Sequence, residues 1–332
     1  MKKQKITQEF RQDPFTSEWV LVSTGREKRV KTIIEPITKT SDLSRLVNPF
    51  ADIIKSATDK NTLLQVKDEA NISQVIVVPN KYPLLKSIHA PIYDTEGPYH
   101  YVSGEGMHEV VIYRDFDIPI RSFSLKKLIL VFQAFQLRSL ALMKLKHIRY
   151  ISIIHNHGMK AGATVAHPHS QIIASPIVPD GIERIVEGAH LYYQTHKRDL
   201  AQTIIDYEQE KGSRVIYENE DFIAIAPYAS KTAYEIEIFP KDAQVHFAYI
   251  KPSAMYHLAQ IYKYILKAYY LQLGDIDYNM NIISAPTDGN VYKGFRWFIR
   301  FTPRIQFVGG YEVGTDTDIC TISPELAAEV LR

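Results

Sequence analysis

Apolar residues follow two periodicities along this chain, and together they form an ordered series of elements in the first half. An alternating run at His108–Tyr113 predicts a strand, and apolar residues at helical spacing predict an amphipathic helix from about Ser124 to Lys146. The run Tyr150–Ile154 predicts a second strand, and the segment His167–Gln171 follows it. The order is strand, helix, strand and terminal segment.

The second half repeats this order. Strands are predicted at Tyr234–Ile238 and Tyr278–Ile283, separated by a helix from about Pro252 to Leu273, and Phe295–Arg300 ends the copy. Corresponding elements lie about 126–128 residues apart. Four elements in register indicate a duplication. The sequence therefore predicts an α+β fold with two half-domains, residues 1–180 and 181–332, each an antiparallel sheet with a long helix packed on it.

Only the first copy ends in histidines. The second has Arg296 and Phe298 in roughly the matching places. We therefore expect one chemically competent half and one supporting half that still shapes the pocket.

Composition and charge narrow the classes of function. The chain has 332 residues and a net charge of +2, which gives no reason to expect a nucleic-acid partner. No apolar run approaches the ~18 residues of a membrane span, and the charged first residues do not form a secretion signal. The single cysteine, Cys320, cannot form an internal disulfide. A soluble cytoplasmic protein without a membrane association is expected.

The segment His167-Pro168-His169-Ser170-Gln171 carries the candidate chemistry. A neutral imidazole is a good nucleophile toward phosphorus and a good leaving group from it, and its pKa lies near physiological pH. Ser170 and Gln171 can donate hydrogen bonds to phosphate oxygens as charge builds up on them. The catalytic residues predicted are therefore His169, the nucleophile, with Gln171 and Ser170.

The stretch before this segment is rich in small residues. Gly158 and Gly162 permit close approach of the backbone to a ligand, while Asn156 and Thr164 offer polar contacts. Two histidines separated by one residue are also common metal ligands. The spacing alone therefore favours phosphate chemistry but leaves metal binding and a structural role open.

At this point the sequence resembles galactose-1-phosphate uridylyltransferase and its relatives in the histidine-triad superfamily, over nearly the whole chain. Several separate motifs carry the resemblance in the family's order. They are Arg11–Pro14 with Glu18–Val20, Arg26–Arg29, Val78–Pro83, Asn156–Gly158 with Gly162, His167–Gln171 and Phe307–Glu312. The resemblance implies two histidine-triad-like half-domains, the second one degenerate, and a homodimer with a shared active site.

The resemblance also implies roles for individual residues. His169 would be uridylylated and Gln171 would steady the phosphoryl group. The matched substrate-binding positions are Arg26, Arg29, Asn80, Asn156, Gly162 and Thr164 toward the nucleotide, and Phe307, Tyr311 and Glu312 toward the sugar phosphate, the last three from the partner subunit. The reaction implied is a ping-pong transfer in which UDP-glucose gives its uridylyl group to His169 and a second hexose-1-phosphate takes it.

The chain departs from the family at its zinc site. Many members bind zinc through a Cys-x-x-Cys pair, a later histidine and the first histidine of the catalytic segment. Here Asn48, Ala51 and Phe116 stand at the other three positions, and only His167 remains. Because structural zinc requires four ligands, no metal or other cofactor is expected, and His167 is expected to shape the pocket.

The function expected is nucleotidyl transfer between a nucleotide sugar and a hexose-1-phosphate, as in a UDP-glucose–hexose-1-phosphate uridylyltransferase. A nucleotide-sugar phosphorylase acting on ADP-glucose is a close alternative, because Ser170 in the histidine segment resembles that group at least as well. A nucleotide-binding protein that has lost turnover is an alternative of another class, suggested by the lost zinc ligands. The sequence leaves the base and the acceptor open.

Overall fold

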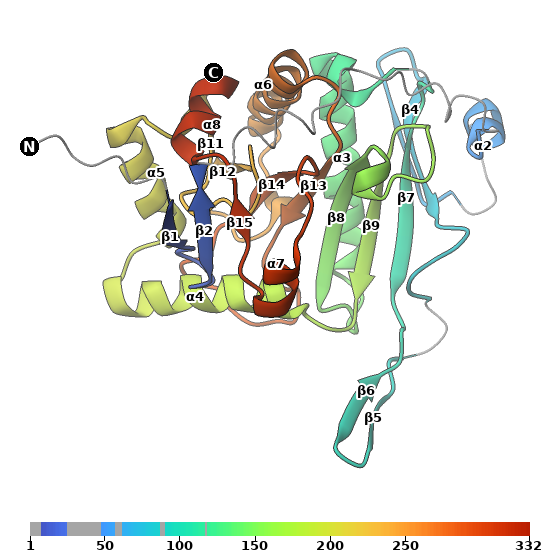
Figure 1. Ribbon diagram of the computed structural model, residues 1–332. Coiled ribbons are helices and arrows are strands. Elements are labelled where there is room, and N and C mark those ends of the chain that lie inside the picture. Colours follow the sequence, from blue (N-terminus) through green and yellow to red (C-terminus); the bar gives the residue numbers. More distant parts are fainter. Residues whose placement is uncertain (1–7, 25–47, 57–61, 87–89, 117) are drawn as a thin grey trace, which may run out of the picture.

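A single antiparallel sheet forms the centre of the molecule. The computed structural model describes residues 8–24, 48–56, 62–86, 90–116 and 118–332. The sheet has ten strands in the order β10-β11-β12-β14-β13-β8-β9-β7-β4-β3 (Figure 1). Their bounds are β3 Leu64–Lys67, β4 Ser73–Pro79, β7 Met107–Tyr113, β8 Tyr150–His157, β9 His169–Ser175, β10 Val215–Glu218, β11 Phe222–Ile225, β12 Ile236–Pro240, β13 Tyr278–Ile283 and β14 Phe298–Pro303.

Each half of the chain contributes five strands, and the two sets mirror each other. From the centre outward, β8-β9-β7-β4-β3 corresponds to β13-β14-β12-β11-β10. The three central strand pairs and the helices α3 and α6 begin 128 or 129 residues apart, for example at His169 in β9 and Phe298 in β14. The predicted duplication and α+β fold are therefore confirmed. The two sheets are not separate, however, because β8 pairs with β13, which places His157 opposite Tyr278.

Long helices cover one face of this sheet because each has a continuous apolar side. They are α3 (Leu125–Leu142) and α6 (Ala254–Leu273), with the shorter α8 (Pro324–Leu331) beside them (Figure 1). The hydroxyl of Ser124 accepts a hydrogen bond from the backbone of Lys127 and caps α3, close to the predicted start. Phe132 of α3 packs edge-on against Tyr262 of α6, with ring centroids 5.3 Å apart. These contacts make one core that runs through both halves.

The opposite face is covered differently in the two halves. In the second half, α4 (Asp180–His196) and α5 (Leu200–Lys211) pack an apolar layer onto the strands. Among the described residues of the first half, α2 (Ala51–Ser56) and Phe50 pack there, against apolar side chains of β4 and β7. The ends of β8 and β9 therefore keep polar side chains on this face, which we call the open face.

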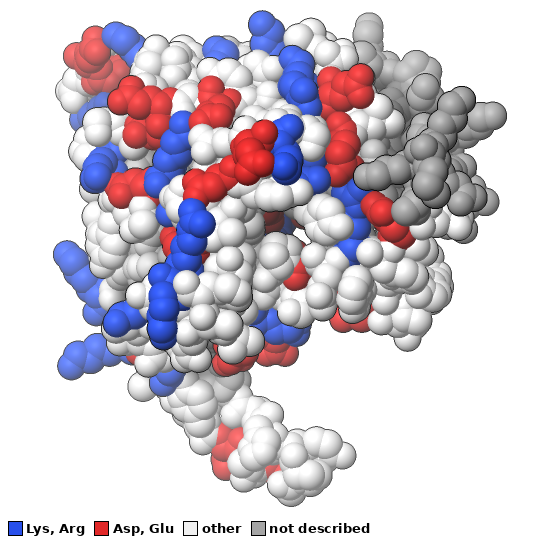
Figure 2. Space-filling view, turned by 90° about the vertical axis from the view of Figure 1, so that its left-hand side faces the viewer, with Lys and Arg blue, Asp and Glu red and all other residues white. Residues whose placement is uncertain are grey.

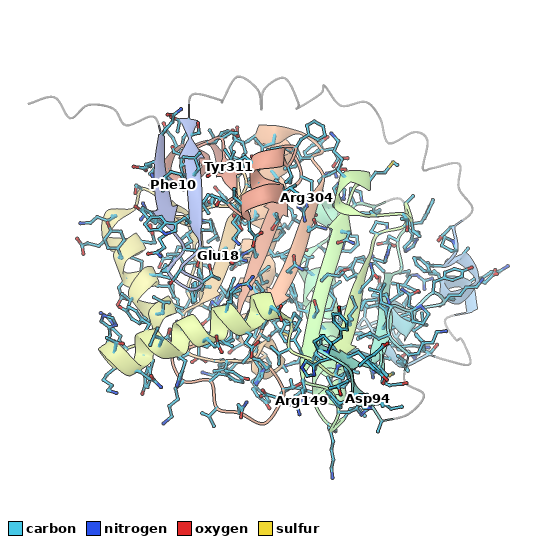
Figure 3. All side chains as sticks on the ribbon, turned by 60° about the horizontal axis from the view of Figure 1, so that its bottom comes forward. Phe10, Glu18, Asp94, Arg149, Arg304 and Tyr311 are labelled. Carbon is cyan, nitrogen blue, oxygen red and sulfur yellow. The ribbon has the colours of Figure 1, made fainter. Side chains whose placement is uncertain are left out.

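The first strands of the chain lie against the second half. β1 (Gln8–Gln12) and β2 (Trp19–Ser23) form a three-stranded sheet with β15 (Ile319–Cys320). Arg11 forms an ion pair with Glu325 at 2.9 Å, and Glu18 one with Arg184 of α4 at 3.2 Å (Figure 3). This N-terminal segment thus crosses the predicted division at residue 180.

The remaining elements are short and lie at the surface. β5 (Tyr93–Glu96) and β6 (Tyr99–Val102) form a hairpin that projects from the body (Figures 1 and 2). The others are α7 (Gly310–Thr315) and the 3-10 turns η3 (Ile120–Ser122), η4 (Met159–Ala161) and η5 (Phe247–Tyr249). Basic and acidic side chains are interspersed on the face in Figure 2, as the near-balanced charge predicts. Among the described residues, no helix is long and apolar enough to cross a bilayer.

Candidate active site

The histidine segment enters β9 at the junction of the two half-sheets. Because side chains alternate along a strand, His169 and Gln171 point to the open face, whereas Ser170 and Ile172 point to the helices. β9 lies between β7 and β8, and β8 adjoins β13 of the second half. β8 therefore lies between His169 and the nearest strand of the second half.

The imidazole of His169 is held in one tautomer. Its Nδ1–H donates to the backbone carbonyl of His167 at 2.8 Å, so Nε2 is left without a proton in the neutral ring. Burial lowers the pKa of His169, which favours the neutral form. The ring of Phe50 packs edge-on against it, with centroids 5.4 Å apart. These contacts present a fixed Nε2 lone pair, which a nucleophile requires.

His167 has a different environment and a different role. It is fully buried, its Nε2–H donates to the carbonyl of Tyr113 at 2.5 Å, and its Nδ1 accepts from the side-chain amide of Asn48 at 3.3 Å. Both ring nitrogens are thus occupied by the protein. His167 thus anchors the segment that carries His169, and it is among the residues that line the neighbouring pocket.

The residues at the family's zinc positions do gather near His167. Asn48 hydrogen bonds to its ring and the phenyl ring of Phe116 packs against it at 5.5 Å, while Ala51 is exposed at the start of α2. An amide, a phenyl ring and a methyl group are not zinc ligands, so this donor set does not fit the metal. In the described ranges, no three His, Cys, Asp or Glu side chains form a group that could bind a metal ion.

Ser170 lies on the far side of the strand from the site. Its hydroxyl is 1% exposed and lies 2.5 Å from the hydroxyl of Tyr113 and 3.2 Å from Nδ1 of His155. It therefore cannot donate to a phosphate on the open face, and the predicted direct contact is corrected. Its contacts link the start of β9 to β7 and β8.

Gln171 takes part in a hydrogen-bonded group on the open face. Its Oε1 lies 2.7 Å from Nε2 of His108 in β7. The side-chain nitrogen of Asn80, a predicted nucleotide contact, lies 3.2 Å from that same ring nitrogen, and Asn80 Oδ1 accepts from the backbone of Tyr82 at 2.9 Å. The predicted residues Asn80 and Gln171 are thus brought together through His108.

The small-residue loop closes over the end of β8. Asn156 Oδ1 accepts from the side-chain nitrogen of Asn279 at 2.8 Å, which leaves the amide nitrogen of Asn156 for other partners. The same Asn279 nitrogen donates to the carbonyl of Ala161 at 2.8 Å, so β13 holds the loop. Gly162 has a φ of +86°, and Thr164 is exposed. Asn156 and Gly162 are adjacent, since a Cβ on Gly162 would lie 3.8 Å from Asn156 Nδ2.

A pocket of about 350 Å³ adjoins this loop. Asn156, Gly158, His167 and Pro168 are among the residues that line it. Gly158 has a φ of +82°, and a Cβ there would collide with the carboxylate of Asp277. The loop therefore requires glycine for close packing as well as for its backbone conformation.

The remaining predicted substrate contacts lie outside the described residues or on the C-terminal segment. Arg26 and Arg29 lie outside the described residues. Phe307 is 75% exposed, with the ammonium of Lys160 5.9 Å from its ring centre, and Tyr311, which is labelled in Figure 3, is half exposed on α7. Glu312 accepts from the backbone of Gly309 at 2.6 Å and of Ile319 at 3.3 Å. Both carboxylate oxygens therefore stabilise the fold of its own segment, and the expected contact with a sugar phosphate stays a prediction.

Three polar residues of the site were not predicted from the sequence. They are His108, which the sequence pattern placed only in a strand, and Asn279 and Arg304. Arg304 Nε donates to Asn279 Oδ1 at 2.6 Å, next to Asn156. The signal for Asn279 was present, since Asn279 and Asn281 alternate with apolar residues in a strand of the second half.

Comparisons with known proteins agree with this arrangement. The model of the galactose-1-phosphate uridyl transferase N-terminal domain matches residues 1–179. The ADP-glucose phosphorylase of Arabidopsis thaliana is 30% identical over 337 residues, covering 98% of this chain and 92% of the relative. The galactose-1-phosphate uridylyltransferase of Thermotoga maritima is 27% identical over 335 residues, covering 98% of both. The crystal structure of the Arabidopsis thaliana phosphorylase with bound ADP-glucose superimposes with a TM-score of 0.81 at 26% identity, covering 98% of both chains.

Proposed function

This chain belongs to the galactose-1-phosphate uridyl transferase family, and from that premise we propose that it transfers a nucleotidyl group between a nucleotide sugar and a hexose-1-phosphate. In the leading case the group is UMP, donated by UDP-glucose. One observation carries the proposal. Nδ1–H of His169 is bonded to the carbonyl of His167, which leaves Nε2 unprotonated on the open face.

The transfer takes place in two displacements at the same phosphorus atom. Nε2 of His169 attacks the α-phosphorus of the nucleotide sugar, the N–P bond forms, and the P–O bond to the departing hexose-1-phosphate breaks. A phosphate oxygen of the acceptor then attacks, the N–P bond breaks, and the neutral imidazole is regenerated. Each step exchanges one bond to phosphorus, so no cofactor is required.

Neighbouring side chains would bind the phosphoryl oxygens. Gln171 lies two residues after His169 on the same face, and Asn156 lies on the adjacent strand. The contact of Asn156 with Asn279 uses the side-chain oxygen of Asn156, so its amide nitrogen can donate to a phosphoryl oxygen. Gly162, Thr164 and Asn80 would complete the nucleotide site, with Arg26 and Arg29 as further phosphate contacts. We also propose that the site works without zinc, because the residues around His167 are not metal ligands.

Phosphorolysis of ADP-glucose is the second candidate. The similarity to the Arabidopsis thaliana ADP-glucose phosphorylase over 98% of this chain favours it. The chemistry at His169 would be the same, with inorganic phosphate as the acceptor. A nucleotide-binding protein without turnover is the third candidate, but the tautomer of His169 and the adjacent Gln171 support catalysis.

A product assay with two donors and two acceptors separates these functions. The protein would be incubated with UDP-glucose or ADP-glucose, each with galactose-1-phosphate or inorganic phosphate, and products followed by ³¹P NMR. UDP-galactose formation supports the leading proposal, and ADP formation from ADP-glucose and phosphate supports the second. Binding of a nucleotide sugar without product under any combination would contradict both. The His169→Ala variant is the matched control, and stoichiometric zinc in purified protein would contradict the metal-free site.

A homodimer with a shared site is part of the proposal. The side chains of Phe307, Val308 and Val313 are each at least 65% exposed, and such apolar exposure is typical of an interface. Light scattering should give the mass of two chains. Mixing His169→Ala chains with Phe307→Ala chains should restore part of the lost activity, because only a mixed dimer contains one intact site. A monomer in solution, or no restoration, would contradict the shared site.

A further inference from the structure

We propose that His108 is a positioning residue that fixes the orientation of the Gln171 side-chain amide, so that its NH₂ group rather than its carbonyl faces the reacting phosphoryl group. The inference rests on the proposed function and adds a residue that contacts no substrate. His108 is 6% exposed and lies in β7, the strand that pairs with β9 on the side away from β8.

The proton on the His108 ring can be placed from its neighbours. The backbone N–H of Leu84 lies 3.0 Å from Nδ1, and an N–H group can only donate, so Nδ1 is the acceptor. The side-chain nitrogen of Asn80 lies 3.2 Å from Nε2 and 3.5 Å from Nδ1, so the backbone N–H of Leu84 is the contact that decides the tautomer. The neutral ring therefore has its proton on Nε2. Burial lowers the pKa of His108, which favours this neutral form.

This tautomer determines which way the Gln171 amide faces. Nε2–H of His108 donates to the atom 2.7 Å away, which must then be the carbonyl oxygen Oε1 of Gln171. A flipped amide would place its NH₂ group against the N–H of the ring, with two donors facing each other. The NH₂ group is consequently directed away from His108. Phosphoryl oxygens accept hydrogen bonds only, so this is the orientation that stabilises charge on the transferred group.

The second half lacks this arrangement at the matching strands. Arg300 of β14 lies two residues after Phe298, as Gln171 of β9 lies two residues after His169. Arg300 is bound by the buried carboxylate of Glu237 in β12, at 2.7 Å. Such an ion pair satisfies both partners, whereas the neutral bond from His108 leaves the NH₂ group of Gln171 able to donate.

His108 also links two parts of the site. Leu84 and Asn80 belong to the segment that matches the family's nucleotide pocket, and Gln171 belongs to the catalytic segment. One imidazole thus receives hydrogen bonds from the first and donates to the second. Loss of the ring should therefore impair the rate of nucleotidyl transfer more than binding of the nucleotide sugar.

Single-turnover nucleotidylation of the full-length protein tests this role. His108→Phe should slow formation of the His169 adduct about 10²-fold, the effect of losing one preorganised donor. His108→Gln should restore most of the rate, because its amide can donate to Gln171 and accept from Leu84. Adding His108→Phe to Gln171→Leu should cause no further loss. Independent, multiplicative losses, or no recovery in His108→Gln, would overturn the proposal. Thermal unfolding of each variant identifies losses due to misfolding.

A second measurement does not depend on turnover. ¹⁵N NMR of the histidine side chains should show the proton of His108 on Nε2 in the wild-type protein. A proton on Nδ1 would overturn the inference even if the enzyme is active. Absence of any adduct in a wild-type protein that has the Nε2–H tautomer would instead contradict the proposed function, so the two failures are distinguishable.

Discussion

The terminal strands of the two halves share one architecture, but they differ in the side chains that cover them, and the proposed chemistry lies on the less covered strand. His169 begins β9 and Phe298 begins β14, and both side chains point to the same face of the sheet. Phe298 is fully buried against Phe15 and Phe239, with ring centroids 5.8 and 5.1 Å apart. His169 packs against Phe50 and remains partly exposed. The two strands therefore differ in the side chains that cover them, and not in the fold of the sheet beneath.

The polar side chains two residues further along each strand, Arg300 and Gln171, also differ in their hydrogen-bond partners. In the second half, Arg300 and Glu237 neutralise each other, and the neighbouring carboxylate of Glu235 lies 3.4 Å from the same guanidinium. In the first half, Gln171 and His108 are both neutral, and the NH₂ group of Gln171 stays able to donate to a ligand. The comparison indicates that a duplicated sheet can use one copy for stability and the other for chemistry.

Removing the nucleophile should have the largest effect. His169→Ala is expected to reduce nucleotidyl transfer by about 10⁴-fold or more, because no other group can form the covalent intermediate. Single-turnover assays measure the rate, and calorimetric titration checks that a nucleotide sugar still binds. A residual rate within tenfold of wild type would mean that transfer does not use His169.

Truncating the matching residue of the second half should act on stability instead. Phe298→Ala removes a fully buried ring and is expected to lower the free energy of unfolding by about 3–5 kcal/mol. The rate per folded molecule, measured well below the unfolding midpoint, should stay unchanged. A large loss of rate in folded protein would contradict the assignment of a stabilising role to β14 and a chemical role to β9.

Breaking the buried ion pair sharpens the comparison further. Arg300→Leu leaves the carboxylate of Glu237 unpaired and should destabilise the protein by about 3 kcal/mol. The double variant Arg300→Leu, Glu237→Leu should regain part of this loss, since the carboxylate that then remains buried, that of Glu235, still accepts a hydrogen bond from the backbone of Lys231. Chemical denaturation measures both. A double variant less stable than Arg300→Leu alone would show that the unpaired carboxylate of Glu237 is not the cause of the loss.

The smallest expected effect is on the pH dependence of the adduct-forming step. The attacking form of His169 is neutral, and burial lowers its pKa below the usual value of about 6.5. The rate at pH 6.5, where an unperturbed imidazole would be half protonated, should therefore exceed half of its plateau value, and it should fall to half only at more acidic pH. Single-turnover rates in buffers of constant ionic strength test this. A half-maximal rate at or above pH 6.5 would contradict the lowered pKa.

The sequence predicted the repeated elements well, because apolar residues recur at helical spacing over the whole length of long segments such as α3 and α6. It did not indicate α4 or α5, and it could not show that β8 pairs with β13, since edge pairing depends on tertiary contacts.

Within the site, contacts between residues close together in the sequence could be predicted, whereas contacts between distant residues could not. The burial of Ser170 could have been inferred from strand alternation once His169 was placed on the open face. The cap formed by Glu312 three residues after Gly309 was also visible as a spacing. The role of His108 was not accessible, because its partner Gln171 lies 63 residues further on and meets it only through strand pairing.

The central claim is that His169 becomes covalently nucleotidylated, and mass spectrometry tests it most directly. Wild-type protein incubated with UDP-glucose or ADP-glucose would be digested at neutral pH, which preserves the N–P bond, and the peptides sequenced by fragmentation. The account predicts a single nucleotidyl group on His169 that disappears when an acceptor is added. A peptide that stays unmodified with both donors, or a group on His167 or any other residue, would contradict it.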